Sequence, residues 1–457
     1  MAALVHDLAH VPYGHTLENE LGVLKEHHDG EARMERFFSR LQGEVEETAT
    51  PENAKKVADL LVYAKRTILT IKVIDNIIKG VGEAPEQGSK APLPPEEWFV
   101  ADIIGNTICA DLLDYVRRDM NACGINQVYD DRIFTYFELA KDERNRTRLA
   151  VRVTKDQGPR LDAVSEVLNV LRMRYTLSER VLFHHTKNVA SAMLGEALGA
   201  IEIERGDLDE LTDDQLLPWI RERAEKQLAG TPKLDATRKL LDGLERRLLH
   251  KPVFRIGPQE AQAYQVARGH HLGDEYSKVD ARQDFQDRIL EEFPQLDMGD
   301  VIVYCPSPRM TMKEVWVHVL TRKDVICRPL REEGQPYLPA VVEQEVQALE
   351  EKYKALWSWN VMLAPDKLSL AFSIQAFIQH KLKVANDPYL QRYLGTNQPV
   401  AREIADRAEG DWRVQAKAVE IAEEQMLAAS GPPDEQVDLD ELVRRARDEL
   451  YPRSDDA

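Results

Sequence analysis

The chain has 457 residues, of which 43% are hydrophobic, and this length suits about two or three domains with substantial cores. The formal net charge of −19 argues against broad binding to nucleic acids or anionic membranes, but it leaves room for a local basic pocket. The four cysteines are widely spaced, so we expect reduced thiols rather than disulfides or a zinc site. The chain shows no apolar run of about 18 residues and no basic leader, so we expect a cytoplasmic protein without a membrane span.

The first informative segment lies at the N-terminus and reads AALVHDLAHVPYGH. We expect a helix that ends before Pro12, because proline lacks a backbone donor and disfavours helix at the residue before it. His6 and His10 are four residues apart, so they project from one helix face with Asp7 beside them. Imidazole next to carboxylate suits a mixed nitrogen and oxygen site for a divalent metal. An amphipathic helix with incidental histidines is the alternative, and a third histidine, His15, favours the metal site.

The pattern then continues as helices. Pro51 is typical of a first helical turn, because its missing donor would be unpaired there in any case. An apolar stripe follows it as far as Ile71. Residues 81–95 are rich in proline and glycine, so we expect a surface loop.

The second informative segment spans residues 101–125. On a helix, Asp111, Tyr115, Arg118 and Asp119 occupy positions i, i+4, i+7 and i+8, which form a single face. Two carboxylates, a phenol and a guanidinium on one face are unusual for a plain core. A solvated face with internal ion pairs is the alternative, and the spacing alone does not decide between the two.

Two β-rich runs, residues 133–139 and 148–154, are expected to pair as an antiparallel hairpin. A long helical pattern then covers residues 161–204. It carries a basic cluster made of Arg172, Arg174, Arg180, His184, His185 and Lys187. Such side chains are natural partners of phosphate oxygens, although an ordinary charged helix surface is an equal alternative on charge pattern alone.

The C-terminal part is expected to be mixed. Helical patterns cover residues 211–226, 232–249 and 261–293, and they are followed by strands at 300–305, 314–320 and 325–330. A helix at 341–357 is expected to pack on these strands. Amphipathic helices follow at 368–382 and 412–429, and then a joint at 430–439, a short charged helix and a flexible end. No chemical motif is evident in this part.

The HDLAHVPYGH segment resembles the HD-domain metal-dependent phosphohydrolases, and it looks most like the branch that hydrolyses deoxynucleoside triphosphates. The resemblance implies that His6 and Asp7 bind a divalent metal, for which Mn, Mg, Fe and Zn are candidates. It also implies that His10 and His15 are catalytic residues that face the substrate phosphates.

Two further catalytic positions follow from the same resemblance. Glu18 takes the acidic position just downstream and could orient the proton donor. His28 looks like the next active-site histidine, and the adjacent His27 is a near-equal candidate. The family's first metal histidine lies upstream of the doublet, and only five residues precede His6 in this sequence. We therefore expect that this ligand is missing here, which puts metal affinity and activity in question.

The helix face at residues 111–119 resembles the family's D-x-x-D-Y-x-x-R-D helix. The resemblance implies that Asp111 is a metal ligand and that Tyr115, Arg118 and Asp119 belong to the substrate site. Leu112 departs from the family, whose better-known members carry a phosphate-binding lysine at that position.

The basic cluster resembles the family segment that holds the triphosphate. Arg174 is the best candidate for that role, with His184 and His185 as further substrate-binding residues. His185 stands where the family commonly has a lysine.

Together these resemblances imply a mainly α fold, with an HD-domain helical core, a small β-hairpin and a C-terminal α+β extension. We expect the HD domain at residues 1–255, a helical connector at 256–298, a C-terminal region at 299–429 and a tail at 430–457. The expected activity is hydrolysis of dNTPs to deoxynucleoside and triphosphate by a homo-oligomer. Alternatives are another nucleotide or phosphomonoester as substrate, or a catalytically silent nucleotide-binding scaffold.

Overall fold

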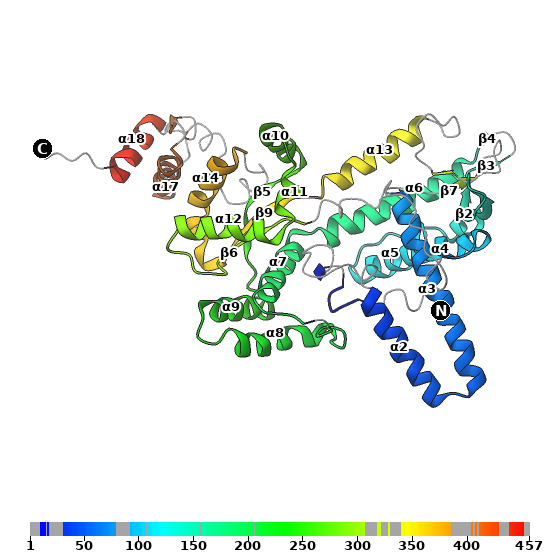
Figure 1. Cartoon of the computed structure of the whole chain (residues 1–457). Coiled ribbons are helices and arrows are strands. Elements are labelled where there is room, and N and C mark those ends of the chain that lie inside the picture. Colours follow the sequence, from blue (N-terminus) through cyan, green and yellow to red (C-terminus); the bar gives the residue numbers. More distant parts are fainter. Residues whose placement is uncertain are drawn as a thin grey trace, which may run out of the picture.

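The computed structural model describes most of the chain. The described residues are 10–14, 16–17, 31–78, 92–106, 108–155, 158–204, 206–306, 318–320, 328–329, 340–384, 404, 407–408, 411–428 and 438–451. Helices dominate these ranges and the sheets are small, so the expected mainly α fold is confirmed (Figure 1). None of the helices in these ranges has the length and apolar character needed to cross a bilayer. The predicted metal doublet at residues 6–7 and the predicted loop at 81–91 lie outside the described residues.

Two long helices, α2 (Glu31–Thr48) and α3 (Pro51–Ile78), pack against each other and form an arm of the molecule (Figure 1). The helix α3 begins at Pro51, as the sequence predicts. A short turn, η3 (Pro95–Glu97), leads into α4 (Trp98–Gly105), and α4 packs on α3 through a shared apolar core.

The predicted hairpin forms from β1 (Phe137–Lys141) and β2 (Thr147–Arg152), which pair antiparallel. The start predicted for its first strand at residue 133 is wrong, because residues 131–136 form a 3-10 helix, η4 (Asp131–Tyr136). The side chain of Asp130 accepts a hydrogen bond from the Arg132 amide and caps this turn. Burial of Ile133 and Tyr136 then holds the turn against the core.

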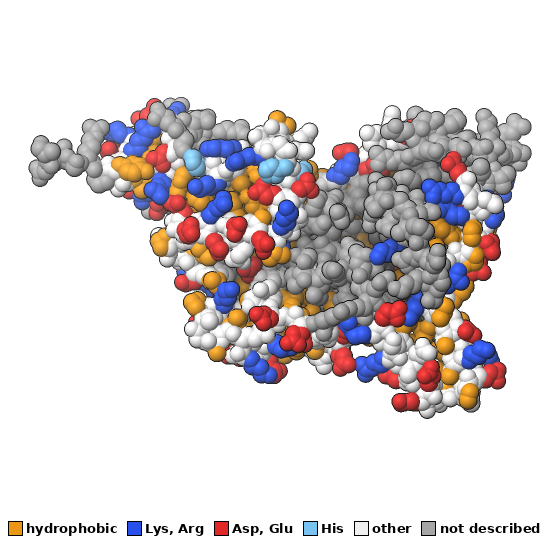
Figure 2. All heavy atoms as spheres, viewed as in Figure 1, with side chains coloured by type: hydrophobic (Ala, Val, Ile, Leu, Met, Phe, Trp, Pro, Cys, Tyr) orange, Lys and Arg blue, Asp and Glu red, His pale blue; other side chains and the backbone are white. Residues whose placement is uncertain are grey.

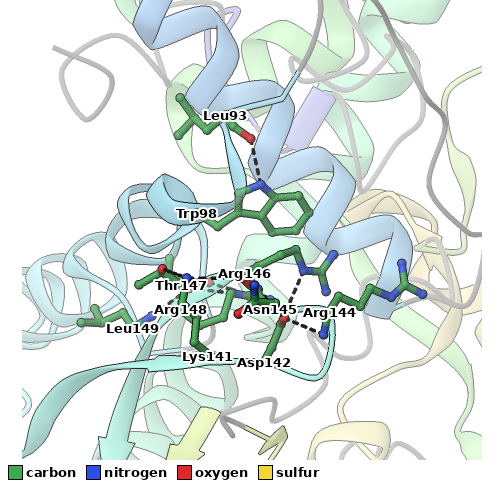
Figure 3. Close-up of polar contacts among 11 residues, drawn as sticks. Leu93, Trp98, Lys141, Asp142, Arg144, Asn145, Arg146, Thr147, Arg148 and Leu149 are labelled. Carbon is green, nitrogen blue, oxygen red and sulfur yellow. Dashed lines mark hydrogen bonds and ion pairs between the residues drawn. The ribbon is translucent and has the colours of Figure 1, made fainter.

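A buried ion-pair network ties this hairpin to α4 (Figure 3). Arg148 Nε and Nη2 donate to the two carboxylate oxygens of Asp102 at 2.8 and 2.7 Å, a bidentate geometry. Asp142, in the turn between the strands, accepts from Arg146 Nε at 2.7 Å. The Arg146 guanidinium stacks 4.2 Å from the centre of the Trp98 ring. The network therefore fixes α4, and with it the start of the next helix, on the sheet.

That next helix is α5 (Ala110–Ala122), and it packs on α6 (Leu161–Leu177). The predicted continuous helix over residues 161–204 is wrong, because it breaks into α6, a π-turn called η5 (Ser178–Leu182) and α7 (His185–Gly199). His184 adopts an extended backbone (φ −61°, ψ 135°), and its Nδ1 accepts from the Thr186 amide. The His184 cap begins a new helix, so the backbone hydrogen bonds of α6 do not continue into α7. Neither proline nor glycine marks this break in the sequence.

A second core forms around α7, α8 (Asp213–Gln227) and α9 (Pro232–Arg246). A three-stranded antiparallel sheet follows in the order β5 (Lys251–Ile256), β9 (Trp359–Leu363), β6 (Val301–Tyr304). The strand β9 was not among the strands predicted from the sequence. The helical run predicted at 261–293 consists of three helices, because Gly269 ends the first with a left-handed backbone (φ +81°). These helices are α10 (Pro258–Arg268), α11 (Leu272–Tyr276) and α12 (Val279–Glu292).

The other predicted strands do not join this sheet. The strand β7 (His318–Leu320) pairs parallel with β2, and β8 (Arg328–Pro329) pairs with β7. The helix α13 (Ala340–Lys354) packs on α6 rather than on the strands, so that prediction is wrong. The chain then forms η7 (Pro365–Leu370), α14 (Ala371–Leu382), α17 (Trp412–Ala428) and α18 (Leu439–Leu450). The predicted domain division stays a prediction.

Candidate functional site

The turn that follows His10 is shaped by a glycine. Gly14 donates its amide hydrogen to the Val11 carbonyl at 2.8 Å and has a left-handed backbone (φ +41°). A Cβ at position 14 would lie 3.2 Å from His10 Nδ1, which is a tight contact. Glycine therefore allows the turn to fold back against the imidazole ring.

Apolar contacts hold this turn on the second core. Val11 and Leu17 are buried in the cluster built by α7, α8 and α9. The Tyr13 amide donates to Asp213 Oδ1 at 2.8 Å, and Asp213 is the first residue of α8. The position of His10 is thus set by packing against helices that lie almost 200 residues away in sequence.

Only part of the expected site lies within the described residues. The residues outside them are His6, Asp7, His15, Glu18, His28 and its alternative His27. The described members are His10, Asp111, Tyr115, Arg118, Asp119, Arg174, His184 and His185.

The N-terminus of α5 presents the expected metal ligand. Cys109 caps the helix, because its Sγ accepts a hydrogen bond from the Leu112 amide at 3.4 Å. Asp111 lies exposed in the first turn, where the helix dipole favours a negative charge. Leu112 is only 3% exposed and belongs to the core between α5 and α6. The residue that stands where the resemblance predicts a lysine is therefore an apolar core residue.

The predicted single face of α5 has two different parts. Tyr115 packs against the core, and burial, its largest perturbation, raises the pKa of its phenol. Arg118 is 62% exposed and pairs with Asp114 at 2.5 Å and with Asp119 at 3.0 Å. The contacts of Arg118 and Asp119 therefore agree with the alternative interpretation of this face, which was a solvated surface with internal ion pairs.

Arg174 lies in the last turn of α6, half-buried beside the same face of α5. Burial lowers the pKa of its guanidinium, but Tyr115, Tyr353, Cys109 and Asp111, in decreasing order, raise it by more. The net pKa lies above the ordinary value, so Arg174 stays charged. Asp111 and Tyr115 of α5 thus lie near enough to Arg174 of α6 to raise its pKa.

Two residues that raise the pKa of Arg174 were not predicted from the sequence. Tyr353 comes from α13, and Cys109 is the residue before α5. A cysteine before a helix could have been read as a weak cap. No sequence pattern links Tyr353 to Arg174, because the packing of α13 on α6 depends on the tertiary fold alone.

His184 and His185 have other neighbours. Their rings lie 4.2 Å apart between centroids. The pKa of His185 is lowered by burial and then by His184, Lys251 and Arg255, the last two from β5. These histidines therefore belong to a basic group at the junction of α7 and β5.

Metal binding rests on donor chemistry. In the described part of the chain, no group of three histidine, cysteine, aspartate or glutamate side chains could hold an ion. Of the expected ligands only Asp111 is described, and an imidazole with two carboxylates would suit Mg, Mn, Fe or Zn.

Over the face seen in Figure 2, acidic and basic side chains alternate among the described residues.

Comparison with known proteins finds distant relatives. The chain is 26% identical over 208 residues to the deoxynucleoside triphosphate triphosphohydrolase SAMHD1 of Bos taurus, which covers 43% of this chain and 32% of that protein. The Homo sapiens protein of the same name is 26% identical over 286 residues, or 56% of this chain and 42% of that protein. The Xenopus laevis protein is 22% identical over 329 residues, or 66% and 48%. The chain thus spans less than half the length of these relatives, and it matches no protein-family model.

Proposed function

We propose that this chain is a metal-dependent phosphohydrolase of the HD type that cleaves dNTPs to deoxynucleoside and triphosphate. The observation that carries the proposal is the packing of α5, with Asp111 and Tyr115, on α6, with Arg174, whose pKa these two residues raise. The distant similarity to deoxynucleoside triphosphate triphosphohydrolases supports the same substrate class. The proposal includes a homo-oligomer, which light scattering of the purified protein can test.

Each group has a role that follows from its chemistry. A divalent ion held by His6, Asp7 and Asp111 would supply charge for the phosphate oxygens and lower the pKa of a bound water. Arg174 binds phosphate oxygens through its planar donors and remains charged, because its pKa is raised. Tyr115 keeps its proton at neutral pH, because burial raises its pKa, and so it can donate a hydrogen bond. His10, held by the Gly14 turn, can transfer a proton near neutral pH.

One observation favours a second candidate substrate. Leu112 is buried in the core, so α5 offers no lysine for phosphate at that position. A smaller phosphate chain, as in another nucleotide or a phosphomonoester, would need fewer cationic partners. Substrate choice is therefore the part of the proposal that the first assay must resolve.

The test is a chromatographic product assay with the purified chain, Mn²⁺ or Mg²⁺, and a panel of dNTPs, NTPs and phosphomonoesters. We expect deoxynucleoside and inorganic tripolyphosphate from dNTPs, with activity lost in Asp111→Asn. Asp114→Asn is the matched control, since Asp114 is one turn further along α5 and, among the described residues, pairs with exposed Arg118. Release of monophosphate, or turnover of phosphomonoesters alone, would favour the second candidate. No turnover with any substrate would contradict both and leave a nucleotide-binding scaffold.

A further inference from the structure

Residues 206–213, which we call the acidic loop, lead into α8 and contact two parts of the chain that are distant in sequence. The Tyr13 amide donates to Asp213 Oδ1 at 2.8 Å. Arg36 of α2 donates from Nε to Asp209 Oδ2 at 2.7 Å. The two acceptors are four residues apart in the sequence, so one short loop contacts both the N-terminal turn and the helix α2.

The backbone of the N-terminal turn is strained at Tyr13. This residue has a left-handed conformation (φ +58°), and Gly14 after it is left-handed too (φ +41°). Glycine adopts such a φ without strain, but for tyrosine the conformation is disfavoured and persists only where the surroundings hold it. The hydrogen bond from the Tyr13 amide to Asp213 supplies such support, because a charged acceptor makes a stronger bond than a neutral one. Asp213 therefore stabilises the turn that lies against the His10 ring.

The acidic loop is itself held at three points. Leu208 is 4% exposed and belongs to the second core. Asp207 accepts from the Glu204 amide at 2.9 Å and pairs with Arg223 of α8 at 2.6 Å. Thr212 caps α8 in a capping box. The carboxylates of the loop therefore have defined places before a ligand binds.

The contact with α2 consists of two ion pairs that differ in exposure. Arg36 donates through both Nε and Nη2 to one oxygen of Asp209, whose side chain is only 15% exposed. Arg40, one turn later, pairs with Glu210 at 2.8 Å, but these two side chains are 63% and 79% exposed. Because exposed pairs contribute little to stability, Asp209 makes the stronger contact with α2.

We propose that the acidic loop is a positioning element of the catalytic site. Asp213 holds the strained turn that places His10, and Asp209 holds α2 on the same loop. The inference rests on the proposed function, because it takes His10 as a residue that transfers a proton. The sequence between the two contacts includes the other expected catalytic residues, His15, Glu18 and His28.

The first test compares Asp213→Ala with Asp213→Asn in the full chain. Alanine removes the acceptor of the Tyr13 amide, whereas asparagine keeps an oxygen that can accept the same hydrogen bond. For Asp213→Ala we expect kcat for dNTP hydrolysis to fall about tenfold, since a misplaced group loses part of the 10²–10⁴-fold that general acid–base catalysis contributes. The KM should stay within about twofold, because the proposed phosphate contact of Arg174 is untouched. Asp213→Asn should keep most of kcat.

Asp214→Ala is the matched control, because Asp214 is also an acidic residue in the first turn of α8, and it accepts from Thr212 at 2.6 Å. Both alanine variants remove a negative charge from the N-terminus of α8, so we expect similar falls in the thermal midpoint. Only Asp213→Ala should lower kcat. Equal losses of kcat in the two variants would overturn the proposal, because they would trace the effect to the stability of α8.

Hydrogen–deuterium exchange gives a readout that does not depend on activity. The peptide that covers residues 11–17 is followed by mass spectrometry in the absence of substrate. We expect its exchange to be about tenfold faster in Asp213→Ala, the factor for the loss of one hydrogen bond to a charged group. Asp213→Asn and Asp214→Ala should exchange at the rate of the unaltered chain. An unchanged rate in Asp213→Ala would overturn the proposal, because the loop would then not hold the turn.

Asp209→Ala tests the contact with α2. We expect a smaller fall in kcat, of about threefold, because Arg36 is 40% exposed and water replaces part of the pairing. Glu210→Ala is the control, since Glu210 and Arg40 pair at the surface, and it should leave kcat unchanged. Equal effects of the two variants would overturn the role of Asp209.

The failure of this inference can be told apart from the failure of the proposed function. Faster exchange with an unchanged kcat in Asp213→Ala would refute the positioning role and leave the proposed activity intact. Absence of turnover by the unaltered chain would refute the proposed activity, and the positioning role with it. Faster exchange together with a lower kcat, in Asp213→Ala but not in Asp214→Ala, is the result that supports the inference.

Discussion

Arg148 on β2 and Arg174 on α6 lie in the same part of the molecule, yet the fold surrounds their guanidinium groups differently. Arg148 is 4% exposed, and Asp102, which is fully buried, accepts two hydrogen bonds from it. Arg174 is half-buried, Tyr115 and Tyr353 raise its pKa, and it forms no ion pair with a carboxylate of the described residues. A buried carboxylate pairs with the charge of the first arginine, whereas the second is the residue that we propose binds phosphate.

The largest expected effect tests the first half of this comparison. Asp102→Ala removes the bidentate partner of buried Arg148 and leaves it the longer ion pair with Asp142, at 3.6 Å. We therefore expect a loss of about 3 kcal/mol in the free energy of unfolding, the lower end of the range for a broken buried pair. Urea denaturation followed by circular dichroism measures it. Arg118→Ala, which breaks only exposed pairs, should cost about 0–1 kcal/mol. Similar losses in the two variants would show that burial does not separate these pairs.

The second half of the comparison is tested by Arg174→Gln. We expect tripolyphosphate affinity to fall at least about tenfold, since a hydrogen bond to a charged group contributes about 1.5–3 kcal/mol. The urea midpoint should change little, because no carboxylate within the described residues loses its partner. Calorimetric titration and urea denaturation on the same preparation supply both values. A large loss of stability with unchanged affinity would place Arg174 in the same class as Arg148.

A smaller effect is expected from the turn that carries His10. Gly14→Ala puts a Cβ on a left-handed backbone 3.2 Å from the imidazole, so we expect a cost of about 1 kcal/mol. We expect kcat/KM to fall by a larger factor than the equilibrium constant for folding, because His10 must move to make room for the added Cβ. Gly124→Ala is the control, since it also has a positive φ but nothing within 4 Å of its Cβ. Equal losses of activity in the two variants would contradict a role for the His10 contact.

The smallest effect concerns a third buried group, His250. Its Nε2 lies 2.8 Å from the Gly299 carbonyl. Its pKa is lowered, first by burial and also by Lys239, although the hydrogen bond to Gly299 and then Asp300 and Asp366 raise it. Because the folded pKa lies below the unfolded value near 6.5, the unfolded state binds protons first as the pH falls. The stability contributed by His250 is therefore present above about pH 6.5 and is lost below it. Urea midpoints at pH 5.5 and 7.5 should differ less in His250→Gln, and an unchanged difference would contradict this role.

The sequence predicted those parts of the site that depend on local periodicity. Asp111 and Tyr115 share a face of α5 because a helix repeats every 3.6 residues, and Pro51 begins α3 for an equally local reason. The break between α6 and α7 was not predictable, because the His184 cap that stabilises it leaves no proline or glycine signal. Tyr353 was not predictable either, because its place near enough to Arg174 to shift its pKa depends on the packing of α13 on α6.

The parallel pairing of β7 with β2 has a consequence for the order in which the molecule can be completed. Val151 lies opposite Val319, and the core beneath α6 needs Val346 of α13. When the ribosome has synthesised only the first 300 residues, the N-terminal half therefore still lacks β7 and β8 of its sheet and the helix α13 that completes its core. Closure of that half must wait for the return of the chain from the C-terminal sheet, which favours slow folding with long-range contacts. The N-terminal half thus depends on the C-terminal half for its packing and for the time at which it can fold. A chain break between β6 and α13 would therefore affect the folding of both halves.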